Sequence, residues 1–133
     1  MIRADMDALP MYEESGLSFA SRGNTAHTCG HDLHSAIGLI AAKVVLKEKA
    51  NFKGTVKFMF QPAEEIFAGS KMMIENGILE NPKVDRALAL HTALDEETGS
   101  ISYNEGYLAT SSDNFKIIIK GKGGHGAYPH TAI

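Results

Sequence analysis

Residues 28–34 hold the side chains best suited to bind a metal ion. Cys29, the only cysteine of the chain, stands two positions before His31, and His34 follows three positions later. A thiolate and an imidazole at this spacing suit a borderline-soft divalent ion. We therefore predict that this segment binds metal. The alternatives for Cys29 are a buried core residue or a nucleophile with a nearby histidine base.

Two further segments add carboxylates and another imidazole. Glu64 and Glu65 follow an apolar stretch that ends in Gln61–Pro62, and His91 follows a second apolar run. Hydrolysis by a metal-activated water needs a base, so one carboxylate could bind metal while its neighbour accepts a proton. The ordinary alternatives are a solvated helix start for the glutamates and a hydrogen-bonded core position for His91.

The hydrophobic pattern predicts an α/β protein. Strands are expected at residues 2–6, 54–60 and 85–90, and helices from about 31 to 50 and over 68–76. Asp32 could cap the first helix, whose apolar side chains form a broad face, and Gly77 could end the second. The alternation of strands and helices predicts an α/β sandwich on a largely parallel sheet.

The candidate chemical groups follow the ends of these strands. Asp7 comes after the first strand, the Glu64–Glu65 pair after the second, and His91 after the third. Ligands of open α/β sheets bind outside the carboxyl ends of the strands, so we expect these segments to meet at one edge. Residues 101–108 look extended and 114–120 read as a strand, which places a domain boundary near residues 110–113.

The composition excludes several classes of protein. A net charge of −3 gives no basic footprint for nucleic acid, and no apolar run approaches the ~20 residues that span a bilayer. One cysteine cannot form an internal disulfide, and no signal peptide is visible. We therefore expect a cytoplasmic protein without nucleic-acid or membrane partners. Both ends of the sequence look cut, so we also expect a fragment of a longer enzyme.

Four motifs in order resemble the M20 family of metallopeptidases, and in particular its amidohydrolase branch. That branch includes hippurate hydrolase, N-acyl-amino-acid amidohydrolases and N-acetyldiaminopimelate deacetylase. The motifs are Arg3–Pro10, Cys29–His34, Gln61–Glu65 and Gly121–His130. The resemblance implies a partial three-layer catalytic domain over residues 1–111 and the start of an α+β lid or dimerisation domain over 112–133. It also implies a homodimer and a small N-acyl amino acid as substrate.

The same resemblance implies roles for single residues. Two divalent ions (zinc, manganese or cobalt) would be bound by Cys29, His31, Glu65 and His91, with Cys29 bridging them. Glu64 would be the general base, Asp7 a carboxylate behind the ligands, and His125 an oxyanion-stabilising residue in a partner's active site. From the residues alone, the glycines around His125 could equally form a tight turn.

Two departures from the family pattern stand out. The family's last histidine ligand lies beyond this sequence, and residues 92–94 lack a proline that the family often has after the histidine at position 91. His34 stays unassigned, either as a polar residue at a helix start or as a substrate contact, and His27 reads as a loop residue.

The predicted function is a metal-dependent amidohydrolase that cleaves the amide bond of N-acyl amino acids with a metal-activated water. One alternative is a truncated, catalytically inactive remnant that at most binds metal. Another is a structural metal-binding or interaction module without hydrolytic chemistry. Glu64 argues against this last alternative, because a closed structural site needs no unligated carboxylate beside a ligand.

Overall fold

The structure is a computed structural model that describes residues 1–107 and 109–132. The chain forms two compact units, Met1–Glu96 and Glu97–Ile133. The first unit contains a parallel three-stranded sheet of β1 (Ile2–Asp5), β2 (Phe58–Gln61) and β3 (Leu88–Ala89), in the order β2-β1-β3. Among the described residues, no helix is both long and apolar enough to cross a membrane.

Strand β1 lies between the other two and fixes their register. Ile2 pairs with Phe58 on one side and with Leu88 on the other. Because all three strands run parallel, their carboxyl ends lie at one edge of the sheet, as the sequence predicts. The strands are shorter than predicted: residues 54–57 and 85–87 lie outside them, since β1 pairs only with Phe58–Gln61 and Leu88–Ala89.

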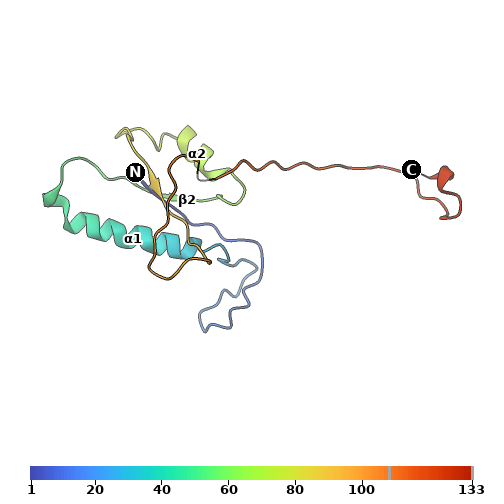
Figure 1. Ribbon diagram of the computed structural model, residues 1–133, viewed down its shortest axis with the longest axis horizontal. Helices are drawn as coiled ribbons and strands as arrows, with labels where there is room; N and C mark the ends of the chain where they lie inside the picture. The colour runs from blue at the N-terminus through green and yellow to red at the C-terminus, as the bar shows by residue number, and fades with distance from the viewer. Residues whose placement is uncertain (108, 133) are drawn as a thin grey trace. The chain divides into compact units, whose positions relative to one another are not determined.

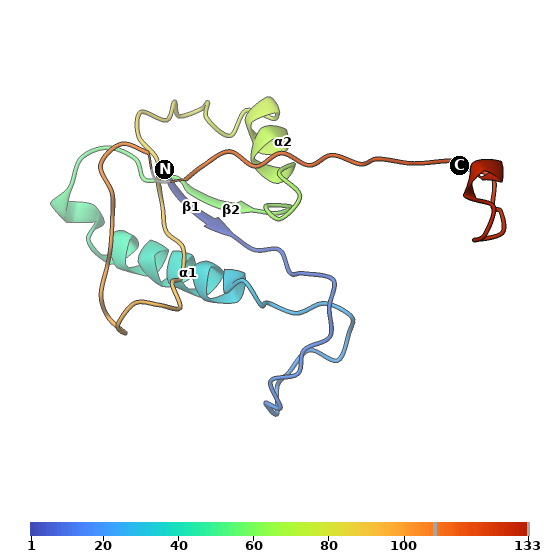
Figure 2. The same ribbon diagram turned by 45° about the vertical axis from the view of Figure 1, so that its right-hand side comes forward.

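Helices α1 (His31–Lys47) and α2 (Gly69–Glu75) lie on opposite sides of this sheet, as Figures 1 and 2 show. Gly38 of α1 packs so closely that a Cβ there would lie 3.2 Å from Ala4 and from Phe60. On the other side, Met59 faces Ile74 of α2 across an apolar cavity. These three layers confirm the predicted α/β architecture on a parallel sheet. A 3-10 helix, η1 (Lys49–Asn51), follows α1.

The start and the buried face of α1 differ from the predictions. Gly30 takes the N-cap position in a left-handed conformation without a side-chain cap, so Asp32 falls within the first turn and does not cap the helix. The buried residues of the helix are His31, His34 and Gly38, while the predicted apolar face is largely exposed. The helix packs on the sheet through the line of His31, His34 and Gly38, because the glycine permits close approach and the histidines join the polar cluster at the strand ends. Gly77 ends α2 with a φ of 82°, as predicted.

The second unit contains one regular element among its described residues, the 3-10 helix η2 (Pro129–Thr131). The strand predicted at 114–120 is wrong: no described segment pairs with these residues, and a strand needs a neighbour for its backbone groups. Leu108, the end of the segment predicted to be extended, lies outside the described residues. The domain boundary predicted between residues 111 and 112 falls inside this unit and stays a prediction.

Candidate metal centre

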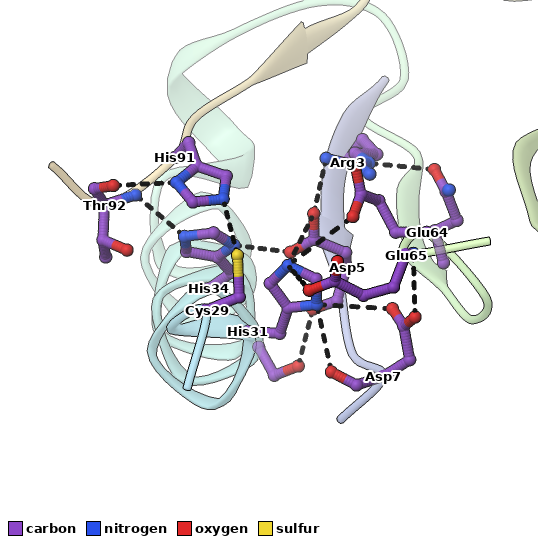
Figure 3. A network of polar contacts seen from close by, with 12 residues as sticks. Arg3, Asp5, Asp7, Cys29, His31, His34, Glu64, Glu65, His91 and Thr92 are labelled. Atoms are coloured by element: carbon purple, nitrogen blue, oxygen red, sulfur yellow. Dashed lines mark hydrogen bonds and ion pairs between the residues drawn. The ribbon is translucent and has the colours of Figure 1, made fainter. Parts of the chain in front are cut away.

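Side chains from four segments of the first unit meet at the carboxyl edge of the sheet (Figure 3). Three groups of three residues each have their ligand atoms within 4.8 Å of one another, and all three groups include the imidazole of His31. They are Cys29–His31–His91, His31–Glu64–Glu65 and Asp5–His31–His34. The edge therefore gathers every candidate site residue that the sequence places in this unit.

His31 is the centre of this cluster and is fully buried. Its Nδ1 lies 3.0 Å from the backbone carbonyl oxygen of Asp7. Because a carbonyl only accepts, Nδ1 carries the proton and Nε2 is left with a free lone pair, the usual arrangement of a metal-binding histidine. Nε2 lies 3.8 Å from carboxylate oxygens of both Glu64 and Glu65.

Asp7 connects His31 to the glutamate pair. Its Oδ2 accepts a hydrogen bond of 3.1 Å from the backbone N–H of Glu65, and its Oδ1 lies 3.3 Å from His31 Nδ1. Burial opposes the charge of Asp7, but the backbone N–H groups of Glu65 and Glu64 hold the pKa of this carboxyl below its ordinary value. Asp7 thus lies behind the candidate ligands as a charged, orienting carboxylate.

A compact turn holds the glutamates at this edge. Ala63 and Phe67 flank it with φ values of 51° and 55°, a left-handed conformation that non-glycine residues adopt at a cost and often at functional sites. The N–H of Gly69 donates to the carbonyl of Ala63, and a Cβ on Gly69 would lie 1.5 Å from the Pro62 oxygen. Since α2 begins only at Gly69, the glutamates do not form a helix start, and that alternative is wrong.

Cys29 and His91 form the open side of the cluster. Cys29 Sγ lies 3.5 Å from His91 Nε2. The Nδ1 of His91 donates to the carbonyl of Thr92 at 2.7 Å, so its Nε2 also offers a free lone pair. Burial, followed by the hydrogen bond to Glu65 and the charge of that carboxylate, raises the pKa of the Cys29 thiol. A raised pKa disfavours Cys29 as a nucleophile, whereas a bound cation would favour the thiolate.

The sequence did not identify two residues of the cluster, Asp5 and His34. The Nδ1 of His34 donates to Asp5 Oδ1, and its Nε2 accepts the backbone N–H of Thr92 at 2.9 Å. Arg3 Nη1 lies 2.7 Å from Asp5 Oδ2. Burial disfavours the charge of Asp5, but the hydrogen bond from His34 and the charge of Arg3 hold its pKa below the ordinary value. The one-turn spacing of His31 and His34 was the available signal.

The donor atoms of the cluster fit divalent metal ions. Four carboxylates and a thiol converge on it, and among the described residues Arg3 is the only lysine or arginine in ion-pair contact with these carboxylates. His31 Nε2 and Glu65 Oε1 are buried without a hydrogen-bond partner in the described part of the chain. Buried polar atoms normally have partners, so atoms left open toward a common point fit the ligand atoms of a cation site. Nitrogen, sulfur and oxygen donors together suit zinc and similar ions.

His125 belongs to the second unit and is exposed. Its Nδ1 accepts the backbone N–H of Ala127 at 3.2 Å. A Cβ on Gly124 would lie 2.8 Å from that of Ala132, so the glycine permits a close approach of two backbone segments. The local geometry thus includes the tight turn, and the catalytic role of His125 stays a prediction.

Known proteins are similar to nearly the whole chain. The model of peptidase family M20/M25/M40 matches residues 1–128. The N-acetylcysteine deacetylase of Bacillus subtilis is 46% identical over 133 residues, which are 99% of this chain and 34% of that protein. The N-acyl-L-amino acid amidohydrolase of Geobacillus stearothermophilus is 42% identical and is covered to 36%. The chain thus spans about a third of the length of these curated relatives.

Solved structures agree with the sequence relatives. A Staphylococcus aureus protein described as an aminohydrolase matches 98% of this chain, with a TM-score of 0.75, 41% identity and 35% of its own length covered. A Bacillus subtilis dinuclear metal binding peptidase from the M20 family matches 71% of the chain, with a TM-score of 0.67 and 45% identity, over 26% of its length. The family model, the relatives and the shared fold lead to one conclusion: this chain belongs to peptidase family M20/M25/M40.

Proposed function

We propose that this protein is a metal-dependent amidohydrolase that cleaves the amide bond of N-acyl amino acids at a site for two divalent ions. One observation carries the proposal: the free lone pair of His31 Nε2 is buried and faces the carboxylates of Glu64 and Glu65. The names of the relatives support the substrate class, since they include an N-acetylcysteine deacetylase and an N-acyl-L-amino acid amidohydrolase.

Four side chains would hold the ions, namely Cys29, His31, Glu65 and His91. The contact of 3.5 Å between Cys29 Sγ and His91 Nε2, and the place of His31 beside Glu65, support this set. When bound, two divalent ions such as zinc, manganese or cobalt would lower the pKa of a water molecule and polarise the amide carbonyl. Cys29, whose Sγ contacts His91 Nε2, would supply a thiolate to the ions.

Glu64 would act as the general base. Its side chain is 31% exposed and lies 3.8 Å from His31 Nε2, so it can reach both the site and an incoming substrate. As the water oxygen bonds to the amide carbon, Glu64 accepts the proton that the water releases. It then returns this proton to the amide nitrogen when the C–N bond breaks, which gives a carboxylic acid and a free amine.

The remaining expectations extend this proposal. Residues 1–111 would belong to the catalytic domain, and residues 112–133 would begin a lid or dimerisation domain. His125, exposed on its glycine-rich loop, would stabilise the oxyanion in the active site of a partner subunit. A homodimer follows from the same family resemblance, and a cytoplasmic location from the composition of the sequence.

The direct test is amine release from N-acetyl amino acids by the full chain, supplied in turn with Zn²⁺, Mn²⁺ and Co²⁺. We expect turnover with metal, loss of turnover with a chelator, and recovery when metal is returned. Metal binding without turnover would support the inactive remnant. Absence of both metal binding and turnover would contradict the proposed function.

A further inference from the structure

We infer that His34, oriented by Asp5, is a positioning residue that fixes His91 beside Cys29 through the backbone of Thr92. The inference rests on the proposed function, because it takes Cys29 and His91 as ligands of the proposed metal site. His34 itself is not a ligand in this proposal, because its two ring nitrogens are hydrogen-bonded to Asp5 and to the backbone of Thr92.

The hydrogen bonds of His34 allow a single arrangement of its protons. The backbone N–H of Thr92 donates to Nε2 at 2.9 Å, so Nε2 carries no proton and Nδ1 must carry one. Nδ1 in turn donates to the Asp5 carboxylate, which can only accept. The ring is 2% exposed and Asp5 is fully buried, so water does not compete for these contacts. Asp5 therefore selects the tautomer that can hold Thr92.

Thr92 passes this constraint to His91. Its carbonyl accepts the Nδ1 proton of His91 at 2.7 Å, while its N–H is held by His34. The rings of His34 and His91 also meet edge to face, with centroids 4.7 Å apart. Both contacts orient the His91 ring so that its Nε2 faces Cys29 Sγ, as Figure 3 shows.

Gly30 completes the contact between the two segments. A Cβ at this position would lie 2.4 Å from Thr92 Oγ1, so Thr92 rests directly on the backbone beside Cys29. Residues 34 and 92 are 58 positions apart, and the sheet alone places only the end of β3. The hydrogen bond from Thr92 to His34 thus ties the segment that follows β3 to the start of α1.

Two substitutions separate the two hydrogen bonds of His34. In His34→Gln, the side-chain oxygen can replace Nε2 and accept the N–H of Thr92, while the contact with Asp5 is lost. In His34→Asn, the amide nitrogen can replace Nδ1 and donate to Asp5, while Thr92 is released. A merely structural role would make the two variants alike, whereas positioning through Thr92 requires that glutamine preserve the site better.

The test is a Co²⁺ titration of the metal-free full chain, followed by the thiolate-to-cobalt absorption band that reports Cys29. We expect His34→Asn to weaken Co²⁺ binding about 10- to 100-fold, the usual effect of losing a group that orients a ligand. His34→Gln should stay within about threefold of the wild type. The exposed His27→Asn is the matched control and should leave the titration unchanged.

Equal affinities in the glutamine and asparagine variants would overturn the inference. If either variant fails to fold, the ring ¹⁵N shifts of His34 in the metal-free wild type decide instead. A proton on Nδ1 supports the inference, and a proton on Nε2 contradicts it, because Nε2 could then not accept from Thr92. A wild type without the cobalt–thiolate band would contradict the proposed function itself, which separates the two failures.

Discussion

The buried and the open halves of the candidate metal centre use their polar groups differently. The inner group, which consists of Asp5, His31 and His34, is at most 2% exposed. Its nitrogens and oxygens contact backbone groups, each other or Arg3, except for His31 Nε2, which lies 3.8 Å from carboxylate oxygens of the outer group. The outer group, Cys29, Glu64, Glu65 and His91, is partly exposed. The polar groups of the inner half are thus held away from solvent, whereas those of the outer half stay partly accessible.

We expect the inner group to contribute most to the free energy of unfolding. The largest fully buried side chains among the described residues are His31, His34 and Asp5, whereas the buried apolar side chains are only Ala4, Ala26 and Met59. Burying a polar group is costly unless its hydrogen bonds are made. Changes in the inner group should therefore affect folding as well as metal binding, while changes in the outer group should affect metal binding or turnover alone.

The largest effect is expected from the outer group, at Glu64. Glu64→Gln keeps the size of the side chain but removes the base, so kcat for an N-acetyl amino acid should fall about 10²- to 10⁴-fold. Its melting temperature and metal content should match those of the wild type. The exposed Glu80→Gln serves as control and should change nothing. A near wild-type kcat in Glu64→Gln would refute the assignment of the base.

Substitutions in the inner group should lower the free energy of unfolding. Asp5→Ala removes the partner of His34 and Arg3, and breaking such a buried pair should lower the free energy of unfolding by about 3–5 kcal/mol. Asp5→Asn keeps an acceptor for His34 and should cost about 1–2 kcal/mol. Urea unfolding of the metal-free protein measures both. If alanine and asparagine were equally harmless, the inner group would not be the stabilising half.

Gly30 lies between Cys29 of the outer group and His31 of the inner group, and it contacts Thr92. Gly77, which has a similar φ value, serves as a matched control. Their φ values are 80° and 82°, but a Cβ meets Thr92 only at Gly30 and open space at Gly77. Gly77→Ala should therefore cost about 1–2 kcal/mol from backbone conformation alone. Gly30→Ala should cost about 1–3 kcal/mol more, because the new methyl group displaces Thr92. Equal losses of unfolding free energy in the two variants would show that the contact between Gly30 and Thr92 does not contribute to stability.

The smallest effect concerns pH and the outer group. Burial raises the pKa of the Cys29 thiol, so at neutral pH a metal ion must displace a proton to bind sulfur. The affinity for Co²⁺ should therefore rise with pH, by about tenfold per unit below the pKa of this thiol. Cys29→Ser should flatten this dependence. Co²⁺ titrations between pH 6 and 8, about the stable range of most proteins, measure how the affinity depends on pH. An affinity of the wild type that does not change with pH would show that Cys29 is not a ligand.

The sequence predicted the outer group better than the inner one, for physical reasons. Glu64, Glu65 and His91 follow strands, and parallel strands bring their carboxyl ends to one edge whatever the details of packing. Asp5 and His34, by contrast, acquire their roles through contacts with residues 29 and 58 positions away, and the one-turn spacing of His31 and His34 does not assign those contacts. The strand expected at 114–120 failed for the same reason, because pairing depends on a distant partner and not on β-branched residues alone.

The most direct test of the metal centre is the metal content of the purified full chain and of two neighbouring variants, Glu64→Gln and Glu65→Gln. Both changes replace a carboxylate by an amide, one residue apart in the same turn. We expect about two divalent ions per chain in the wild type and in Glu64→Gln, and a clear loss in Glu65→Gln. A wild type without bound metal, or the same content in both variants, would contradict the account.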